Sequence, residues 1–176
     1  MNANVENHAS PESSGGNTPK HSPAITNKDH PFLEGLNSHQ HQLLSDCAIH
    51  AHFEPDETIF REGDPANRFY LIQKGRVALE VRNKDHGCNL IQTVRAGEGL
   101  GWSWLFPPCF WHFDARALEP TEALFIQGKI LREECEADHH LGYELTKRLA
   151  AVMLRRLQAT RRQLLKLNED PLAKPA

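Results

Sequence analysis

The hydrophobic and polar positions of the chain follow three successive patterns. Residues 1–29 carry few large apolar side chains and cannot bury enough surface to offset the entropy of ordering, so we expect a disordered polar leader. Residues 30–137 alternate short apolar runs with turn residues, whereas residues 138–168 keep helical spacing without a proline. These patterns predict one β-rich domain that ends in a long helix, followed by a disordered tail at 169–176.

Short strands dominate the expected domain. One helix should come first, because Asn37–Ser38 is a suitable cap for the helically spaced apolar residues that follow it. In the run 76–82, Val77 and Leu79 fall on one face and Ala78 and Glu80 on the other, the pattern of a strand half buried in a core. Many short strands with regular turns predict a small sandwich or roll. The expected strands are 50–53, 58–61, 68–73, 76–82, 89–94, 111–118 and 123–127.

The long helix carries two apolar stripes. One repeats in alternating steps of three and four, the spacing of a coiled-coil seam, and therefore predicts a parallel homodimer. Its members are Tyr143, Thr146, Ala150, Met153, Leu157, Thr160, Leu164 and Leu167. The second stripe could lie on the strands and consists of Leu141, Leu145, Leu149 and Val152. The alternative is that the whole helix packs on its own domain, although residues 157–167 extend beyond what such a domain can cover.

Composition fits one soluble domain without a membrane span. Hydrophobic residues make up 39% of the chain, the mean hydropathy is −0.56 and the net charge is −3. The N-terminus has no signal-peptide pattern, so we expect a cytoplasmic protein. Four cysteines without paired spacing are interpreted as reduced thiols, and His50 and His52 as residues of an exposed strand rather than metal ligands. No nucleophile–base pair, carboxylate pair or metal constellation indicates an enzyme.

Several stretches resemble the cyclic nucleotide-binding domain of the catabolite-activator and fumarate-nitrate-regulator (Crp/Fnr) superfamily. They are HPFLEGL, EPDETIFREGDPANRFYLIQKGRVALEV, IQTVRAGEGLG and ARALEP. The resemblance implies a mainly β fold: an eight-stranded, jelly-roll-like β-roll with a short N-terminal helix and a long C-terminal dimerisation helix. Gly63, Gly75, Gly97 and Gly101 fall in its turns, where glycine tolerates conformations that a side chain would penalise.

The ligand cassette of that family departs from its pattern here. The family pattern is Phe-Gly-Glu-Leu-Ala-Leu-Leu, a short loop and Arg-Ala-Ala-Thr-Val, in which Glu binds the ribose and Arg the cyclic phosphate. Aligned without a gap, the Glu position is Trp102 and the Arg position is Trp111. Indole offers one neutral donor and no acceptor, so neither residue can make the family contact. Losing one charge-assisted contact alone lowers affinity about ten- to a hundredfold, and high-affinity binding of cyclic AMP is not expected.

Aromatic residues replace the cassette. Six of the thirteen in the chain lie within twelve positions: Trp102, Trp104, Phe106, Phe110, Trp111 and Phe113. One hypothesis is a pocket for a cyclic nucleotide or another small planar ligand, under a lid stiffened by Pro107–Pro108. Its candidate residues are Gly101, Trp102, Ser103, Trp104, Trp111, His112 and Arg116. The alternative is that the rings fill the pocket and leave a ligand-free module. Haem held by Cys109 or His112 is a third possibility, which no second ligand supports.

The C-terminal end suggests how such a module would act. Too few residues follow Asn168 for the helix-turn-helix of the family's transcription factors, so we expect no direct DNA reading. Seven basic residues lie on the long helix: Lys147, Arg148, Arg155, Arg156, Arg161, Arg162 and Lys166. Arg156 and Arg161 would face and repel each other across a parallel dimer. The basic face either is simply solvated or docks an acidic protein or RNA. The two hypotheses are therefore a dimeric sensor signalling through its helix and a ligand-free adaptor.

Overall fold

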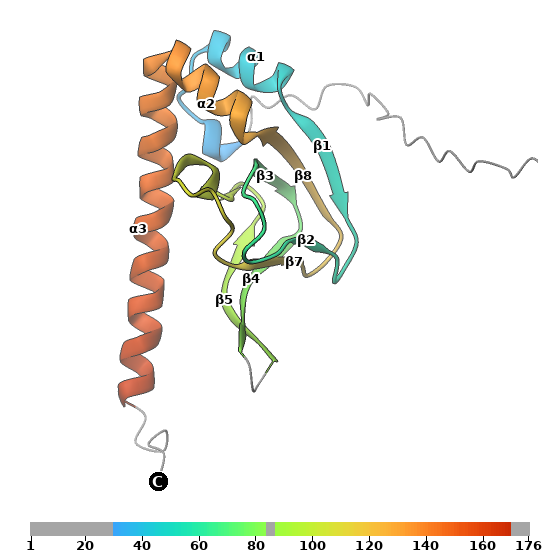
Figure 1. Ribbon diagram of the computed structural model, residues 1–176, viewed down its shortest axis with the longest axis vertical. Coiled ribbons are helices and arrows are strands. Elements are labelled where there is room, and N and C mark those ends of the chain that lie inside the picture. The colour runs from blue at the N-terminus through green and yellow to red at the C-terminus, as the bar shows by residue number, and fades with distance from the viewer. Residues whose placement is uncertain (1–29, 84–86, 170–176) are drawn as a thin grey trace, which may run out of the picture.

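The computed structural model describes residues 30–83 and 87–169, shown in colour in Figure 1. The expected leader and the expected tail from residue 170 onward lie outside these residues, whereas Glu169, predicted as the start of the tail, ends the last helix. A β-roll stands beside one long helix, and shorter helices cover the end of the roll from which that helix starts (Figure 1). The helical elements are η2 (Pro31–Leu33), α1 (Ser38–Asp46), η3 (Ser103–Leu105), α2 (Gly128–Ala137) and α3 (His139–Glu169).

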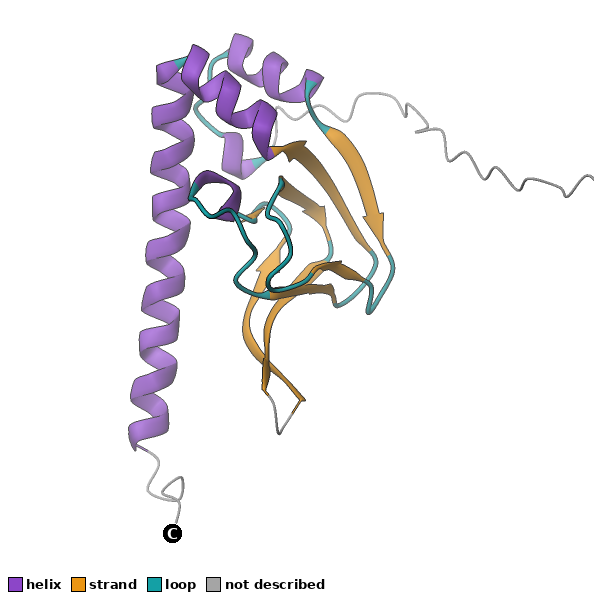
Figure 2. Cartoon of the chain, viewed as in Figure 1, coloured by secondary structure: helices purple, strands orange, loops and turns teal. Residues whose placement is uncertain are grey.

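Eight strands form two antiparallel sheets, as Figure 2 shows in orange. The first sheet has the order β1-β8-β3-β6 and the second the order β2-β7-β4-β5. Their bounds are β1 (Ile49–Phe53), β2 (Thr58–Phe60), β3 (Arg68–Lys74), β4 (Arg76–Asn83), β5 (Gly87–Arg95), β6 (Gly99–Leu100), β7 (Asp114–Ala117) and β8 (Thr121–Gln127). The expected fold class, a mainly β roll with flanking helices, is confirmed.

The apolar residues form two separate clusters. One fills the space between the sheets and contains Tyr70, Ile72, Val77, Leu79 and Leu100 among its members. The other joins the outer face of the first sheet to the helices through residues of η2, α1, β3, β8, α2 and α3. Because burying apolar surface is the main favourable term of folding, the second cluster is what holds α3 against the roll.

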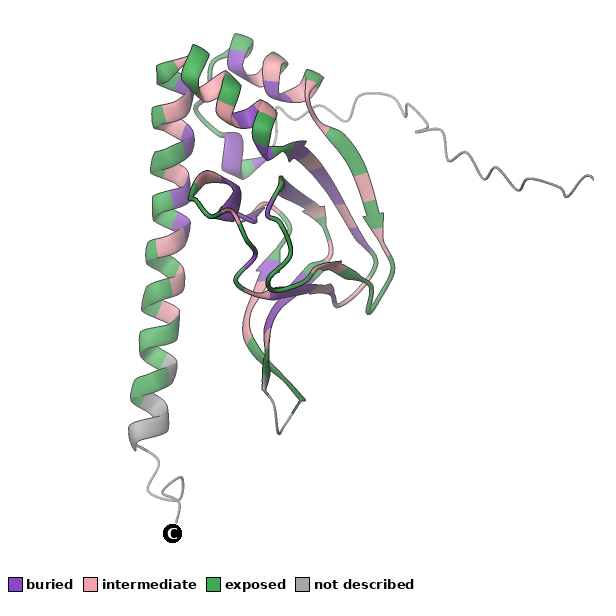
Figure 3. Ribbon diagram, in the orientation of Figure 1, coloured by how far each residue is buried: buried purple, intermediate pink, exposed green. Residues whose placement is uncertain are grey.

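The two stripes of α3 have different environments. Leu141, Leu145, Leu149 and Val152 are buried in the second cluster, as the sequence predicted for them. In the seam, Met153 is half-buried, whereas Leu157 and Leu164 are 67% and 57% exposed. Figure 3 shows most of the described side chains in the far half of α3 as exposed. The side chain of Leu167 lies outside the described ones. The alternative prediction, that the whole helix packs on its own domain, is therefore wrong for residues 157–164.

Four points about the strands and helices differ from the sequence prediction. The helix α2 and the strand β6 were not predicted, and β7 begins at Asp114 rather than at Trp111. In β4 both faces are covered, because Ala78 is fully buried and Glu80 is only 7% exposed. The guanidinium of Arg116 on the neighbouring β7 covers Glu80 through two hydrogen bonds of 3.2 and 2.6 Å. An ion pair therefore replaces the solvent that the alternating pattern predicted.

The remaining sequence assignments concern single residues. His50 and His52 lie exposed on the edge strand β1, as expected. The four cysteines are free thiols. Gly75 has a φ of +89° in the turn between β3 and β4, and a Cβ there would lie 2.5 Å from Thr121, so this turn requires glycine. Among the described helices, none combines the length and apolar character needed to cross a membrane.

Candidate functional site

The backbone places the cassette residues between the two sheets. Leu100 ends β6 beside Tyr70 of β3, and Gly101 then turns the chain with a φ of +86° into η3. After η3 the chain returns along the turn at 63–66, where Trp111 N–H donates to Asp64 O and Trp111 O accepts from Gly63 N–H, both at 2.9 Å. These two bonds fix the backbone on either side of the Trp111 ring, so the ring is held inward.

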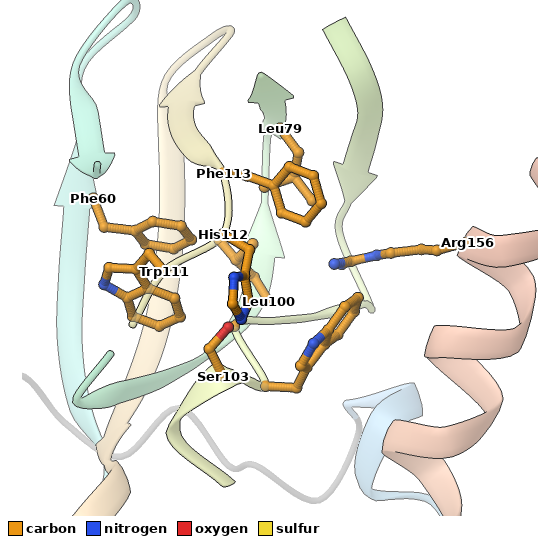
Figure 4. A pocket seen from close by; sticks show the side chains of 10 residues that line it. Phe60, Leu79, Leu100, Ser103, Trp111, His112, Phe113 and Arg156 are labelled. Carbon is orange, nitrogen blue, oxygen red and sulfur yellow. The ribbon is translucent and has the colours of Figure 1, made fainter. Parts of the chain in front are cut away.

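Trp111, which the gapless alignment predicts to hold the family arginine position, lies inside the roll. Its indole is 5% exposed and stacks on Phe60 with ring centroids 3.9 Å apart and planes 13° from parallel. A Cβ on Gly101 would lie 2.8 Å from the same indole, so only glycine leaves space for it. Figure 4 shows the two rings lying face to face. The stack belongs to the core of the roll as much as to the site.

Trp102, which the same alignment predicts to hold the family glutamate position, contacts the long helix. The guanidinium carbon of Arg156 on α3 lies 4.1 Å from the centroid of its ring, a cation–π contact. Burial lowers the pKa of Arg156 to about 10, with the charge of Arg155 adding to this and that of Glu98 opposing it. At neutral pH Arg156 therefore remains charged. Its side chain turns toward the roll, and the repulsion with Arg161 across a dimer seam stays a prediction.

A small cavity remains between these side chains. Its walls include Ser103, which is buried, and His112, which is exposed at the rim, together with the rings of Trp102 and Trp111 (Figure 4). The open space is about 20 Å³, enough for about one water molecule. Sites for small organic ligands are at least about 300 Å³. In this conformation the cavity cannot hold a nucleotide.

The structure brings together five of the seven candidate ligand residues: Gly101, Trp102, Ser103, Trp111 and His112. Trp104 instead lies in the other apolar cluster, 1% exposed and 6.3 Å from Phe69 between ring centroids. Arg116 binds Glu80 and Asp56 and does not line the cavity. Phe106 and Phe110 are 50% and 44% exposed, so the aromatic segment divides among cavity, core and surface.

Four apolar wall residues and one charged residue were missed as site residues. Phe60, Leu79, Leu100 and Phe113 come from four different strands or loops, and Arg156 from α3. Phe113 could have been found, because it belongs to the aromatic run. Nothing in the spacing of Arg156 connects it with Trp102, because 54 positions separate them in the sequence.

Metal or haem ligation gains no support from the geometry. Within the described ranges, no three His, Cys, Asp or Glu side chains come together in a metal-binding arrangement. Cys109 directs its Sγ to the backbone oxygen of Trp104 at 3.5 Å, so it is turned toward η3. His112 is at the rim of a cavity that has space for about one water molecule. A haem group would not fit beside it.

Known proteins resemble this chain in both sequence and fold. A regulator from Mycobacterium tuberculosis (strain CDC 1551 / Oshkosh), named a CRP-like cAMP-activated global transcriptional regulator, is 29% identical over 112 residues, or 64% of this chain and 48% of the relative. The chain thus spans about half the length of the curated relatives it matches. A protein from Geobacter metallireducens GS-15 described as cyclic nucleotide-binding has a TM-score of 0.65 and 28% identity, over 72% of this chain and 91% of that one. The Thermus thermophilus catabolite activator protein has a TM-score of 0.63 and 22% identity, over 78% and 63% of the two chains.

The family comparison identifies the same domain. The model of the cyclic nucleotide-binding domain family matches residues 50–138, which is about half of the chain and includes every strand from β2 to β8 as well as α2. The relatives are named as regulators and binding proteins rather than enzymes. The chain therefore belongs to the cyclic nucleotide-binding domain family.

Proposed function

We propose that this domain is a non-enzymatic regulatory module whose nucleotide pocket is filled by its own side chains and whose output lies in α3. The Trp111–Phe60 stack is the observation that carries the proposal, because it occupies the space and removes the charge that a cyclic phosphate would need. The module would then resemble its relatives in fold and in the use of a long helix, while its resting state needs no nucleotide.

The link between pocket and output is the contact between Trp102 and Arg156. Trp102 belongs to the cassette and Arg156 to α3, so any movement of the cassette would alter the position or the environment of the helix. Beyond Val152 the helix is held by few contacts with the roll, and its seam is exposed. We propose that a second copy covers this seam in a parallel dimer through Ala150, Met153, Leu157, Thr160, Leu164 and Leu167.

Titration calorimetry with cyclic AMP, cyclic GMP and cyclic di-GMP tests the ligand part. The wild-type protein should bind none of them at micromolar concentration. Restoring the family residues in the double variant Trp102→Glu/Trp111→Arg should gain cyclic AMP binding, by about ten- to a hundredfold for each restored charged contact. Phe106→Ala, in the same segment but exposed, is the matched control and should behave like wild type. Micromolar binding by wild type would overturn the proposal.

Sedimentation velocity tests the dimer. Leu157→Asp places a charge in the seam and should give a monomer. Leu165→Asp changes another exposed leucine, which lies at an outer position of the heptad, and should remain dimeric. If Leu157→Asp sediments as an unchanged dimer, the seam is wrongly assigned.

A ligand that displaces Trp111 is the second candidate function. It is favoured by the convergence of Trp102, Trp111, Ser103 and His112 on one cavity, which offers two indole faces and two polar groups. A planar molecule could take the place of the Trp111 ring on Phe60 and shift the population of α3 positions. A screen of planar heterocycles by thermal shift distinguishes this function, because a hit must lose its effect in Trp102→Ala.

Docking of an acidic partner is the third element of the proposal. Arg155, Arg161 and Arg162 are exposed and make no ion pair among the described residues, whereas Lys147 and Arg148 bind Glu144. Three free cations on a projecting helix suit an acidic protein surface or RNA. Binding that disappears in the triple Ala variant and weakens with salt would support this role.

A further inference from the structure

The guanidinium of Arg156 has no direct polar partner among the described residues, although the carboxylate of Glu98 acts on its charge. Its Nε is buried and has no hydrogen-bond acceptor, and within the described chain its guanidinium makes no ion pair. The stack on Trp102 satisfies one face of the guanidinium but none of its N–H groups, which lie in its plane. A buried donor left without a partner is unfavourable, so the Nε group calls for an acceptor.

The cavity beside Arg156 offers donors but no acceptor with negative charge. Ten residues line it, and none of them is Asp or Glu (Figure 4). Apart from Arg156 and the two indoles, the polar side chains are Ser103, whose hydroxyl can donate, and His112, whose ring N–H can donate. The carboxylate whose charge acts on Arg156 belongs to Glu98, which lies outside the lining and accepts from Arg95 N–H at 2.7 Å.

We propose that this cavity binds one small inorganic anion, of the size of chloride, between Arg156, Ser103 and His112. The size of the cavity selects the class of ligand: about 20 Å³ accommodates one water-sized particle and excludes a nucleotide, a sulfonate or a sugar acid. Apolar walls of Phe60, Leu79 and Phe113 keep the local dielectric low, which strengthens the attraction between the anion and the guanidinium.

An anion in this place would connect the roll to the helix. Ser103 and His112 belong to the cassette, whereas Arg156 belongs to α3, so the ion contacts both elements at once. Occupancy would hold α3 against the cassette in addition to the cation–π contact and the packing of Trp104 in the apolar cluster of α3. This inference rests on the proposed function only in that the pocket stays closed to nucleotides. The anion site is tested with chloride and the proposed function with cyclic nucleotides, so one proposal can fail while the other holds.

Thermal unfolding in chloride against gluconate, at constant sodium and ionic strength, provides the main test. Gluconate is too large for the cavity and serves as the inert anion. At chloride tenfold above its Kd, the folding equilibrium should shift about elevenfold, a rise in the wild-type midpoint of about 3–6 °C. Arg156→Gln should lose this rise, whereas Arg155→Gln, the exposed neighbour, should keep it. Equal chloride dependence of wild type and Arg156→Gln would overturn the proposal.

Crystals soaked in bromide give a readout that does not depend on stability. An anomalous peak within hydrogen-bond distance of Arg156 Nε supports the site. A cavity without an anomalous peak in wild-type crystals refutes it, because water rather than an anion then serves as the acceptor. Glu98→Gln tests the other possible counterion. If this variant acquires a chloride response that wild type lacks, Glu98 neutralises Arg156 in solution and the proposed anion site is wrong.

Discussion

Replacing Trp111 by alanine tests whether the former ligand site now belongs to the core. The indole is 5% exposed and stacks on Phe60 at 3.9 Å. Deleting a buried tryptophan costs about 3–5 kcal/mol, of which the ring pair contributes about 0.5–1.5 kcal/mol. Against a total stability of about 5–15 kcal/mol for an ordinary domain, we expect a large drop in the guanidinium midpoint with a fold that still forms. Circular dichroism during guanidinium unfolding measures the loss.

Two further samples make this result decisive. Trp111→Leu keeps apolar volume and should lose less stability than Trp111→Ala. Free indole added to Trp111→Ala should recover part of the loss, because an apolar cavity of the right shape binds the group that was removed. Phe106→Ala, at an exposed ring, should stay within about 0.5 kcal/mol of wild type. A loss below about 1 kcal/mol for Trp111→Ala would refute the view that its ring supports the roll.

Three other changes have expected outcomes. Gly101→Ala should cost about 1–3 kcal/mol, because φ is +86° and the new Cβ would meet Trp111 at 2.8 Å, and a double-mutant cycle with Trp111→Ala should show that the two losses are less than additive. Burial lowers the pKa of His30 below 6.5, so as the pH falls the unfolded chain takes up the proton before the folded chain does. The contribution of neutral His30 to folding stability is therefore present above about pH 6.5 and is lost as the pH falls below that value. Unfolding midpoints across this range should fall less steeply in His30→Asn. Arg116→Ala should lower stability by about 1–3 kcal/mol, because it leaves the buried carboxylate of Glu80 without its donors; a normal midpoint in urea would contradict this.

Sequence patterns anticipated the elements whose burial depends on local periodicity. The inner stripe of α3, with Leu141 and Leu145, is buried as its spacing predicts, because residues three and four apart share one face of a helix. The short edge strand that contains His50 was also predicted correctly. The burial of Glu80 on the second face of β4 was not predicted, because Arg116 from another strand covers it. Which strands lie next to each other depends on sheet order, which the alternation of apolar and polar residues does not reveal.

The cassette divides in the same way. From the residues alone it followed that Trp102 and Trp111 cannot make the family contacts, since indole lacks the needed charge whatever its position. Whether those rings line a ligand site or fill it depends on the distance between Trp111 and Phe60. The sequence likewise did not determine whether the side chain of Arg156 faces a partner or the roll. Side-chain chemistry is a property of each residue and is therefore present in the sequence. Proximity between residues far apart in the chain is created by packing, and only the tertiary structure decides it.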